Sequence, residues 1–167
     1  MFRSVALPPK VAGRLYLHSM PGRYEPLEEV CSEVDRCRID TVACLAPLSE
    51  IRQKAPTYAA AIEARSLPWT IRSCPIPDFG VPDDFSTFAN LANEVAVSLR
   101  EGNGVLVHCA GGVGRTGTFA ICVLIELGFE LDHALQFVRD AGSAPETSAQ
   151  RAFIRDFESS SRSDRET

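Results

Sequence analysis

The segment from Val107 to Thr118 reads VHCAGGVGRTGT and contains four of the eleven glycines of the chain. It follows a short apolar run and precedes a long one, so it is expected to join a buried strand to a buried helix. Several backbone N–H groups of such a turn point inward, and the positive end of the helix dipole adds to their field. Glycines let the backbone approach a bound group closely. The segment therefore predicts a site for a tetrahedral oxyanion.

Two reactive side chains flank this loop, because Cys109 begins it and Arg115 ends it six positions later. A loop that curls around an oxyanion brings both to one ligand, where the planar guanidinium can hold two oxygens. The inward amides, the helix dipole and the guanidinium favour the thiolate over the thiol, which makes Cys109 a nucleophile that oxidises readily. The expected anion-binding residues are Cys109, Ala110, Gly111, Gly112, Val113, Gly114 and Arg115. A Walker-type nucleotide loop is excluded, because no Gly-Lys-Ser/Thr occurs.

The sequence His-Cys, five residues, then Arg-Thr-Gly resembles the signature of the cysteine-dependent protein tyrosine phosphatase superfamily. The stretches IPDFGVPDD before the loop and SAPETSAQRAF after it are similar to the small atypical dual-specificity phosphatases. The resemblance extends over Pro75 to Phe157 and is weak before that. It implies hydrolysis of phosphate monoesters through a cysteinyl-phosphate on Cys109, with Arg115 holding the phosphoryl group. It implies neither a metal nor a cofactor.

The resemblance also implies a general acid on a loop opposite the thiolate. Asp78 matches the family's acid, and it lies in the proline-flanked stretch PIPDFGVP, which cannot form regular structure. Asp83 and Asp84 compete for this role, although both also suit the N-terminus of a helix.

Four further residues receive supporting roles from the same resemblance. The Thr116 hydroxyl is expected either to donate to the cysteine sulfur or to cap the helix. His108 is expected to organise the loop through hydrogen bonds rather than to carry protons. Gln150 is a candidate for positioning the attacking water and Glu146 for contacting the loop, and for both an ordinary polar position at a helix start stays open.

The rest of the chain must supply the elements that hold this loop. Apolar periodicity predicts strands at Arg14–His18, Ile39–Leu45, Trp69–Cys74 and Gly104–His108. It predicts helices at Pro26–Arg36, at Ala59–Arg65, from Asp83 or Asp84 to Gly102, at Arg115–Leu127, at Leu131–Val138 and at Ala149–Phe157. This alternation indicates an α/β fold, a central mostly parallel twisted sheet flanked by helices. We expect one phosphatase domain over residues 1–158 and a polar, disordered tail over 159–167.

Composition narrows the compartment and the partners. The 167 residues include 22 acidic and 17 basic side chains, a net charge of −5, which argues against nucleic acid or an anionic membrane as a partner. No apolar run reaches the ~20 residues that span a bilayer, and no secretory signal is expected. The six cysteines lack metal-binding pairs, so we expect reduced thiols in a cytoplasmic protein without an obligate partner.

The loop interior bears on the substrate. Phosphoinositide phosphatases of the superfamily tend to carry lysines where this chain has Ala110 and Val113, so an inositol lipid is disfavoured. We expect a phosphorylated protein or peptide, with phosphotyrosine first and phosphoserine or phosphothreonine if the pocket is shallow. The larger tyrosine-specific enzymes carry an extra segment whose aromatic residue walls a deep pocket, and this sequence has no counterpart of that segment, although Tyr16 and Tyr24 stay open for the role. The alternatives are a phosphatase of phosphoinositides or of nucleotide or RNA 5′-phosphates, a sulfurtransferase, and a phosphate-binding module without turnover.

Overall fold

The computed structural model describes the backbone of residues 1–165 and shows a five-stranded sheet in the order β1-β2-β5-β3-β4. The strands are β1 (Arg3–Val5), β2 (Arg14–His18), β3 (Ile39–Cys44), β4 (Thr70–Ser73) and β5 (Gly104–His108). β1 runs antiparallel to β2, and every other pairing is parallel. The expected mostly parallel sheet is confirmed. β1 was not predicted, because three residues are too few to show a period.

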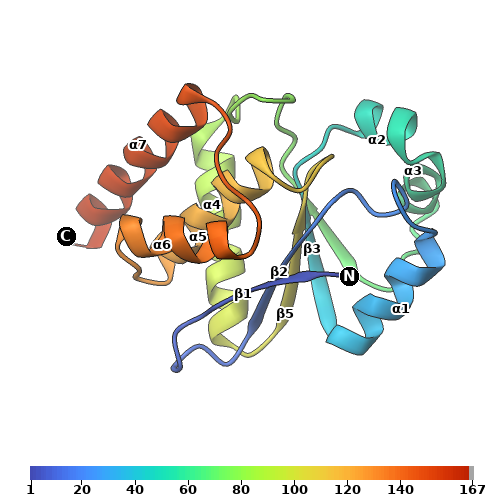
Figure 1. Cartoon of the computed structure of the whole chain (residues 1–167), viewed down its shortest axis with the longest axis horizontal. Helices are drawn as coiled ribbons and strands as arrows, with labels where there is room; N and C mark the ends of the chain where they lie inside the picture. The colour runs from blue at the N-terminus through green and yellow to red at the C-terminus, as the bar shows by residue number, and fades with distance from the viewer. Residues whose placement is uncertain (166–167) are drawn as a thin grey trace.

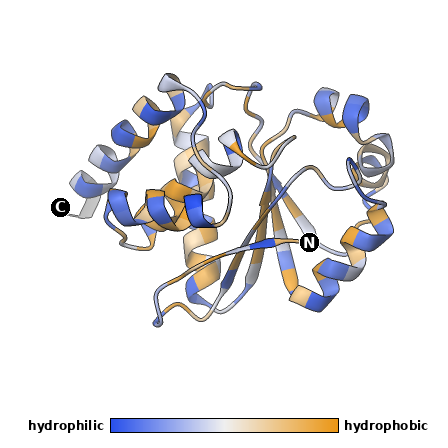
Figure 2. Cartoon of the chain, viewed as in Figure 1, coloured by the Kyte–Doolittle hydropathy of each residue, from blue (hydrophilic) through white to orange (hydrophobic). Residues whose placement is uncertain are grey.

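Helices cover both faces of this sheet, as Figure 1 shows. On one side lie α1 (Leu27–Cys37), α2 (Leu48–Lys54) and α3 (Pro56–Glu63). On the other side lie α4 (Phe85–Arg100), α5 (Gly114–Glu126), α6 (Leu131–Asp140) and α7 (Ser148–Arg165). The helices in Figure 2 turn most of their hydrophobic residues toward the sheet and their hydrophilic residues outward. The three-layer α/β fold expected from the sequence is therefore confirmed.

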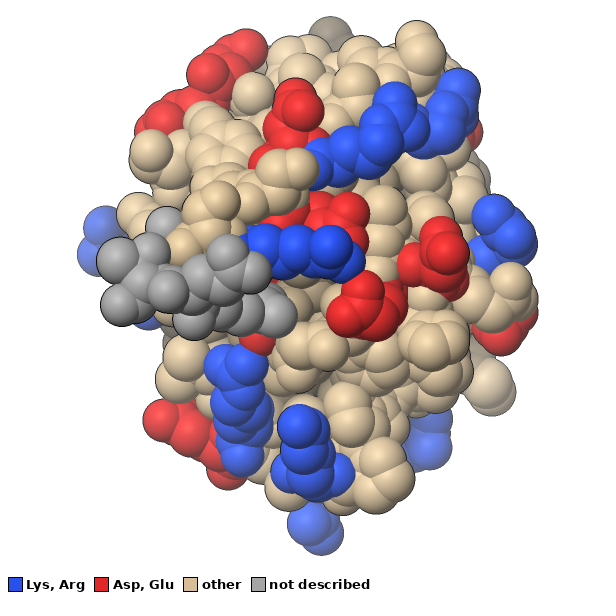
Figure 3. Space-filling model, turned by 90° about the vertical axis from the view of Figure 1, so that its left-hand side faces the viewer, with Lys and Arg blue, Asp and Glu red and all other residues tan. Residues whose placement is uncertain are grey.

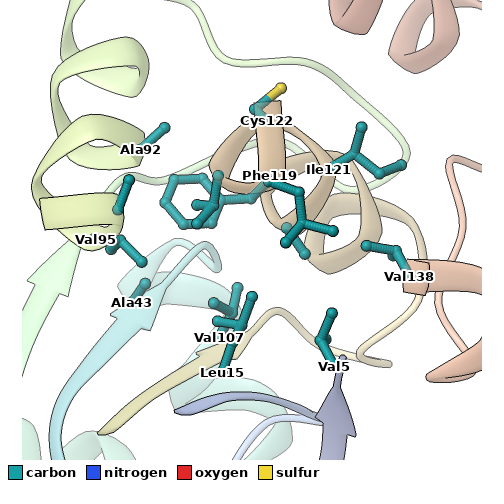
Figure 4. Packing of buried hydrophobic residues seen from close by; sticks show 14 of the residues in the cluster. Val5, Leu15, Ala43, Ala92, Val95, Val107, Phe119, Ile121, Cys122 and Val138 are labelled. Atoms are coloured by element: carbon teal, nitrogen blue, oxygen red, sulfur yellow. The ribbon is translucent and has the colours of Figure 1, made fainter. Parts of the chain in front are cut away.

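The central strand β5 divides the core into two clusters, because successive side chains of a strand point to opposite faces. Val105 and Val107 belong to the cluster under α4 and α5, whereas Leu106 belongs to the cluster under α1 and α3. Helix α5 is buried from Gly114 to Ile125. In Figure 4 its Phe119 points toward α4, where it meets Phe88 edge to face at 5.2 Å. A rigid core therefore holds the strand and the helix that flank the glycine-rich loop.

The C-terminal segment differs from its prediction. Residues 159–165 continue α7 instead of forming a disordered tail, and residues 166–167 lie outside the described residues. Phe157 anchors this helix in the core, and Ser161, one turn later, is still buried. Arg162 pairs with Glu158 at 2.7 Å and with Glu130 at 2.8 Å. These contacts stabilise a polar sequence as helix, which composition alone does not reveal.

All six cysteines are free thiols in the structure. Within the described residues, no helix combines the length and the apolar character that crossing a membrane requires.

Candidate active site

The site lies at the carboxyl ends of β3, β4 and β5. These strands are parallel, so the segments that follow them meet at one edge of the sheet. The segment after β3 carries Glu50, the segment after β4 carries Asp78, and the loop after β5 begins with Cys109.

The glycine-rich loop wraps tightly around the sulfur of Cys109. This side chain is buried, and its Sγ accepts a hydrogen bond from the Gly112 N–H at 3.2 Å. Gly112 has a φ of 74°, and a Cβ there would lie 2.4 Å from the His18 carbonyl oxygen. A Cβ on Gly114 would lie 2.1 Å from Oε2 of Glu146. Gly112 therefore requires glycine, because its φ is positive and the neighbouring atom belongs to the backbone, whereas at Gly114 the neighbour is the end of the Glu146 side chain. α5 begins at Gly114, so its N-terminus closes the loop.

Arg115 is buried, and both of its terminal nitrogens have acceptors. Its Nη1 donates to Glu50 Oε2 at 2.8 Å and to the Ile76 carbonyl at 2.9 Å. Its Nη2 donates to Glu50 Oε1 at 3.1 Å and to Asp78 Oδ1 at 2.9 Å. The hydrogen bonds from Arg115 lower the pKa of the Glu50 carboxyl to about 2. The guanidinium plane is therefore fixed from the side of β3 and α2 before any ligand arrives.

Asp78 lies at the mouth of a hollow of about 270 Å³ whose lining includes Cys109 and Arg115. The carboxylate is half exposed, and its Oδ2 is 3.9 Å from Lys54 Nζ. The competing acids lie elsewhere: Asp84 caps α4 by accepting from the Ser86 N–H at 3.0 Å, and Asp83 is exposed outside the hollow. The structure thus brings together Cys109, Arg115 and Asp78.

A family model described as "Swiss Army Knife protein, DSP-PTPase phosphatase domain" matches residues 11–166. The chain belongs to this DSP-PTPase family. Cyclin-dependent kinase inhibitor 3 of Rattus norvegicus is 33% identical over 87 residues, which are 50% of this chain and 41% of that protein. Tyrosine-protein phosphatase non-receptor type 2 of Homo sapiens is 38% identical over 63 residues, 34% of this chain and 15% of that one. The matches span less than half the length of these relatives.

Solved structures share the DSP-PTPase fold over nearly the whole chain. Kinase-associated phosphatase, with its catalytic cysteine replaced by serine, has a TM-score of 0.83 at 20% identity and covers 97% of this chain and 96% of its own. Tk-PTP in its active form has a TM-score of 0.71 at 28% identity, over 92% of this chain and 99% of its own. The likeness to kinase-associated phosphatase shows the fold alone.

His108 of this DSP-PTPase domain is fully buried between two hydrogen bonds. Its Nδ1 lies 3.0 Å from the Cys109 carbonyl, so this nitrogen donates, and Nε2 accepts from the Tyr58 hydroxyl at 3.0 Å. Burial lowers the pKa of the imidazole to about 4. This geometry is consistent with the organising role expected for His108. Tyr58 was missed, because nothing in the local sequence of α3 points to a partner fifty positions away.

The hydroxyl of Thr116 is buried and has no hydrogen-bond partner among the described residues. Its expected bond to the Cys109 sulfur is not formed here, and the N-cap position of α5 belongs to Val113 rather than to Thr116. The hydroxyl that does bond within the helix is that of Thr118, which donates to the Gly114 carbonyl at 2.8 Å. A catalytic role for Thr116 therefore stays a prediction.

Gln150 is buried and joins the acid loop to the start of α7. Its Oε1 accepts from the Glu146 N–H at 2.7 Å, and its Nε2 donates to the Gly80 carbonyl at 3.1 Å. Thr147 adds a second link, from its hydroxyl to the Phe79 carbonyl at 3.3 Å. Glu146 lines the hollow, and its carboxylate lies against Gly114 of the loop.

The rim of the hollow carries exposed aromatic side chains. Tyr24 is 66% exposed and Phe79 is 60% exposed, and both line the hollow. Arg23, which also lines it, stacks its guanidinium carbon 4.6 Å from the centre of the Tyr24 ring. Tyr16 lies instead on β2 with its ring 6.2 Å from that of Phe2. Of the two tyrosines considered from the sequence, Tyr24 is the one at the site.

No group of three or more His, Cys, Asp or Glu side chains within the described part of the chain is arranged to hold a metal ion.

Proposed function

We propose that this chain hydrolyses phosphate monoesters on proteins, phosphotyrosine first, through a cysteinyl-phosphate on Cys109. The observation that carries the proposal is the convergence of three groups on one hollow: a thiol in a loop of backbone amides, the Arg115 guanidinium, and the Asp78 carboxyl 2.9 Å from it. A nucleophile, an anion holder and an acid are the parts that this chemistry needs.

In the first step the Cys109 thiolate attacks phosphorus, so that an S–P bond forms while the P–O bond to the substrate breaks. The departing oxygen takes a proton from Asp78. Arg115 and the loop amides hold the three remaining phosphoryl oxygens, whose charge is spread in the transition state. In the second step water attacks phosphorus, Asp78 accepts the proton of that water, and the S–P bond breaks to release phosphate and regenerate the thiolate.

The ion pair between Asp78 and Arg115 fits this sequence of steps. The hydrogen bonds of Arg115 use both hydrogens of Nη1 and both of Nη2, and one of these goes to Asp78. A dianionic phosphoryl group binds Arg115 more strongly than a single carboxylate does, so it displaces Asp78 from Nη2. Once displaced, the Asp78 carboxyl is free to reach the oxygen of the leaving group. Substrate binding thus releases Asp78 from Arg115 for its proposed role as the acid.

The rim supports an aromatic phosphoester. Tyr24 and Phe79 offer two exposed rings against which a phosphotyrosine ring can pack, a contact that phosphoserine cannot make. On the face formed by α6 and α7, basic and acidic side chains are interspersed (Figure 3). The basic side chains on this face do not form the continuous positive surface that nucleic acid requires.

The test is steady-state hydrolysis by the purified chain of phosphotyrosine, phosphoserine and phosphothreonine peptides, inositol phospholipids and nucleotides. Phosphotyrosine peptides are expected to be the best substrates, with a rate that peaks at mildly acidic pH. Cys109→Ser is expected to retain binding and lose turnover, because a serine hydroxyl is scarcely ionised at neutral pH. Faster hydrolysis of inositol phospholipids, or transfer of sulfur from thiosulfate to cyanide, would overturn the proposal.

The acid is tested with a matched pair of variants. Asp78→Asn keeps the shape of the side chain but has no proton to give, so kcat is expected to fall by ~10²–10⁴ with KM little changed. Asp83→Asn, five positions away on the same segment, is expected to keep the wild-type rate. The assignment of Asp78 is wrong if the two variants behave alike.

A further inference from the structure

Arg3, on the short antiparallel strand β1, reaches the outer side of the glycine-rich loop. Its Nη2 donates to the Gly112 carbonyl at 2.5 Å, and its Nη1 donates to the Gly142 carbonyl at 2.5 Å. The Ser143 hydroxyl donates to the same Gly112 carbonyl at 2.6 Å. One carbonyl of the loop is therefore held by two donors from segments far away in the sequence.

The sheet dictates this placement. Arg3 pairs with Leu17 of β2, and Val5 with Leu15. Residues two apart on a strand share a face, so Arg3 lies on the same face as Val5, which packs in the core below α5 and α6. Arg3 therefore lies on the face of the sheet that α5 and α6 cover, from which it reaches Gly112 and Gly142. No local pattern pointed to this contact, because 109 positions separate Arg3 from Gly112.

The orientation of one peptide group follows from these bonds. The structure has no cis peptide bond, so the carbonyl of Gly112 and the N–H of Val113 point in opposite directions across their shared peptide plane. The carbonyl points to Arg3 and Ser143, which do not line the hollow, whereas Val113 does. The Val113 N–H is therefore turned toward the hollow. We propose that Arg3 is a positioning residue, which fixes this peptide so that its N–H binds the phosphoryl oxygen.

The charge of Arg3 adds to this effect. Both of its hydrogen-bond acceptors are neutral carbonyls, and no ion pair of Arg3 occurs among the described residues. Burial lowers the pKa of the guanidinium, and the electrostatic interaction with nearby Cys109 opposes that shift. An uncompensated cation beneath the loop attracts the thiolate and the incoming dianion alike.

This inference deepens the proposed phosphatase site and rests on it, yet it is not implied by membership of the family. The family match begins at residue 11, and Arg3 lies before it. The contact of Arg3 with the loop depends on β1. Cys109, Arg115 and Asp78 lie after β4 and β5, and β1 pairs with neither of these strands.

The experiment measures inorganic phosphate binding through protection of Cys109 from iodoacetamide, which needs no turnover. Arg3→Gln is expected to weaken phosphate binding about tenfold, to slow alkylation at a given pH, and to lower kcat/KM. Arg3→Lys keeps the charge and one donor, so it is expected to recover part of the loss. Arg14→Gln, an exposed arginine on the adjacent strand β2, is the matched control and is expected to bind phosphate like the wild type.

A purely structural role of Arg3 makes a different prediction: Arg3→Gln would lower the melting temperature and leave phosphate affinity and alkylation unchanged. That result overturns the inference while the proposed function stands. Conversely, phosphate binding that depends on Arg3 in a chain that hydrolyses nothing overturns the proposed function alone. If Arg3→Gln does not fold, Ser143→Ala tests the inference in its place. This variant removes the second donor to the Gly112 carbonyl and is expected to weaken phosphate binding about threefold. Unchanged affinity in Ser143→Ala and Arg3→Lys also overturns the inference.

Discussion

Arg115 is the residue on which the other side chains of the site depend. A guanidinium that is only 2% exposed loses most of its hydration. The Glu50 carboxylate compensates for this loss, because it accepts two charge-assisted hydrogen bonds from Arg115. Glu50 is itself held by Lys54 at 2.6 Å. Through the ion pairs of Lys54 with Glu50 and of Glu50 with Arg115, the charge that we propose binds phosphate is already positioned in the free protein.

Glu50→Gln tests this dependence. The substitution leaves a buried cation without its bidentate partner, so the free energy of unfolding is expected to fall by about 3–5 kcal/mol and kcat/KM with it. Urea unfolding and steady-state kinetics measure the two effects. Glu63→Gln is the matched control, because Glu63 pairs with Arg52 at the surface and such pairs contribute less than ~1 kcal/mol. Equal losses in both variants would contradict the central position given to Arg115.

At the scale of elements, the site is held by close backbone contacts between segments. Gly117 in the first turns of α5 lies against the connection between α6 and α7, where a Cβ would come 2.7 Å from the Ala144 nitrogen. That connection leads directly to Thr147 and Gln150, which bind the acid loop. The packing of one helix thus helps to determine where Asp78 lies.

Gly117→Ala is expected to lower the free energy of unfolding by about 1–2 kcal/mol, because the added methyl group meets backbone atoms that cannot rotate away. This loss outweighs the ~1 kcal/mol by which alanine favours a helix over glycine. Gly111→Ala is the control. Its Cβ would have no atom within 4 Å, so its stability is expected to stay within ~0.5 kcal/mol of the wild type. Thermal unfolding of the two variants measures the difference. A Gly117→Ala protein as stable as Gly111→Ala would show that the two segments can separate at no cost.

At the scale of the whole molecule, the sheet separates two apolar cores, and His108 is buried between them at the end of β5. Its ring is neutral in the folded state, because burial lowers its pKa from 6.5 to about 4. The unfolded chain therefore binds more protons than the folded chain between these two values. Stability is complete above pH 6.5 and declines as the pH falls toward 4.

The decline is expected to amount to ~3 kcal/mol, the free energy of a shift of this size. Urea unfolding at pH 7.5 and pH 4.5 measures it, and in His108→Gln the difference is expected to be smaller. Burial also lowers the pKa of His18, so part of the decline remains in that variant. His133→Gln, on the exposed side of α6, is the control that leaves both buried rings in place. An undiminished decline in His108→Gln would assign the effect to other groups.

The parts of the site that can be predicted from the sequence are local. The spacing of Cys109 and Arg115 and the glycines between them determine the loop, and the alternation of strands and helices determines the fold class. The contacts that were missed are distant: Glu50 is 65 positions from Arg115, and Tyr58 is 50 positions from His108. Each of these residues lies in an ordinary helical stretch, and only the folded sheet brings it to its partner. No local pattern encodes such a pairing.

Phe79 follows Asp78 directly and adopts a φ of 58°, a backbone conformation that a bulky side chain rarely takes. Thr147 and Gln150 donate hydrogen bonds to the carbonyls of Phe79 and Gly80, the two residues that follow Asp78. These bonds limit how far the backbone at Asp78 can move. We expect the Asp78 carboxylate to leave Arg115 by a small rotation of the backbone next to Phe79. If Asp78 is the general acid, proton delivery depends on how firmly the start of α7 holds Phe79 and Gly80, and substitutions that loosen α7 are expected to slow the reaction.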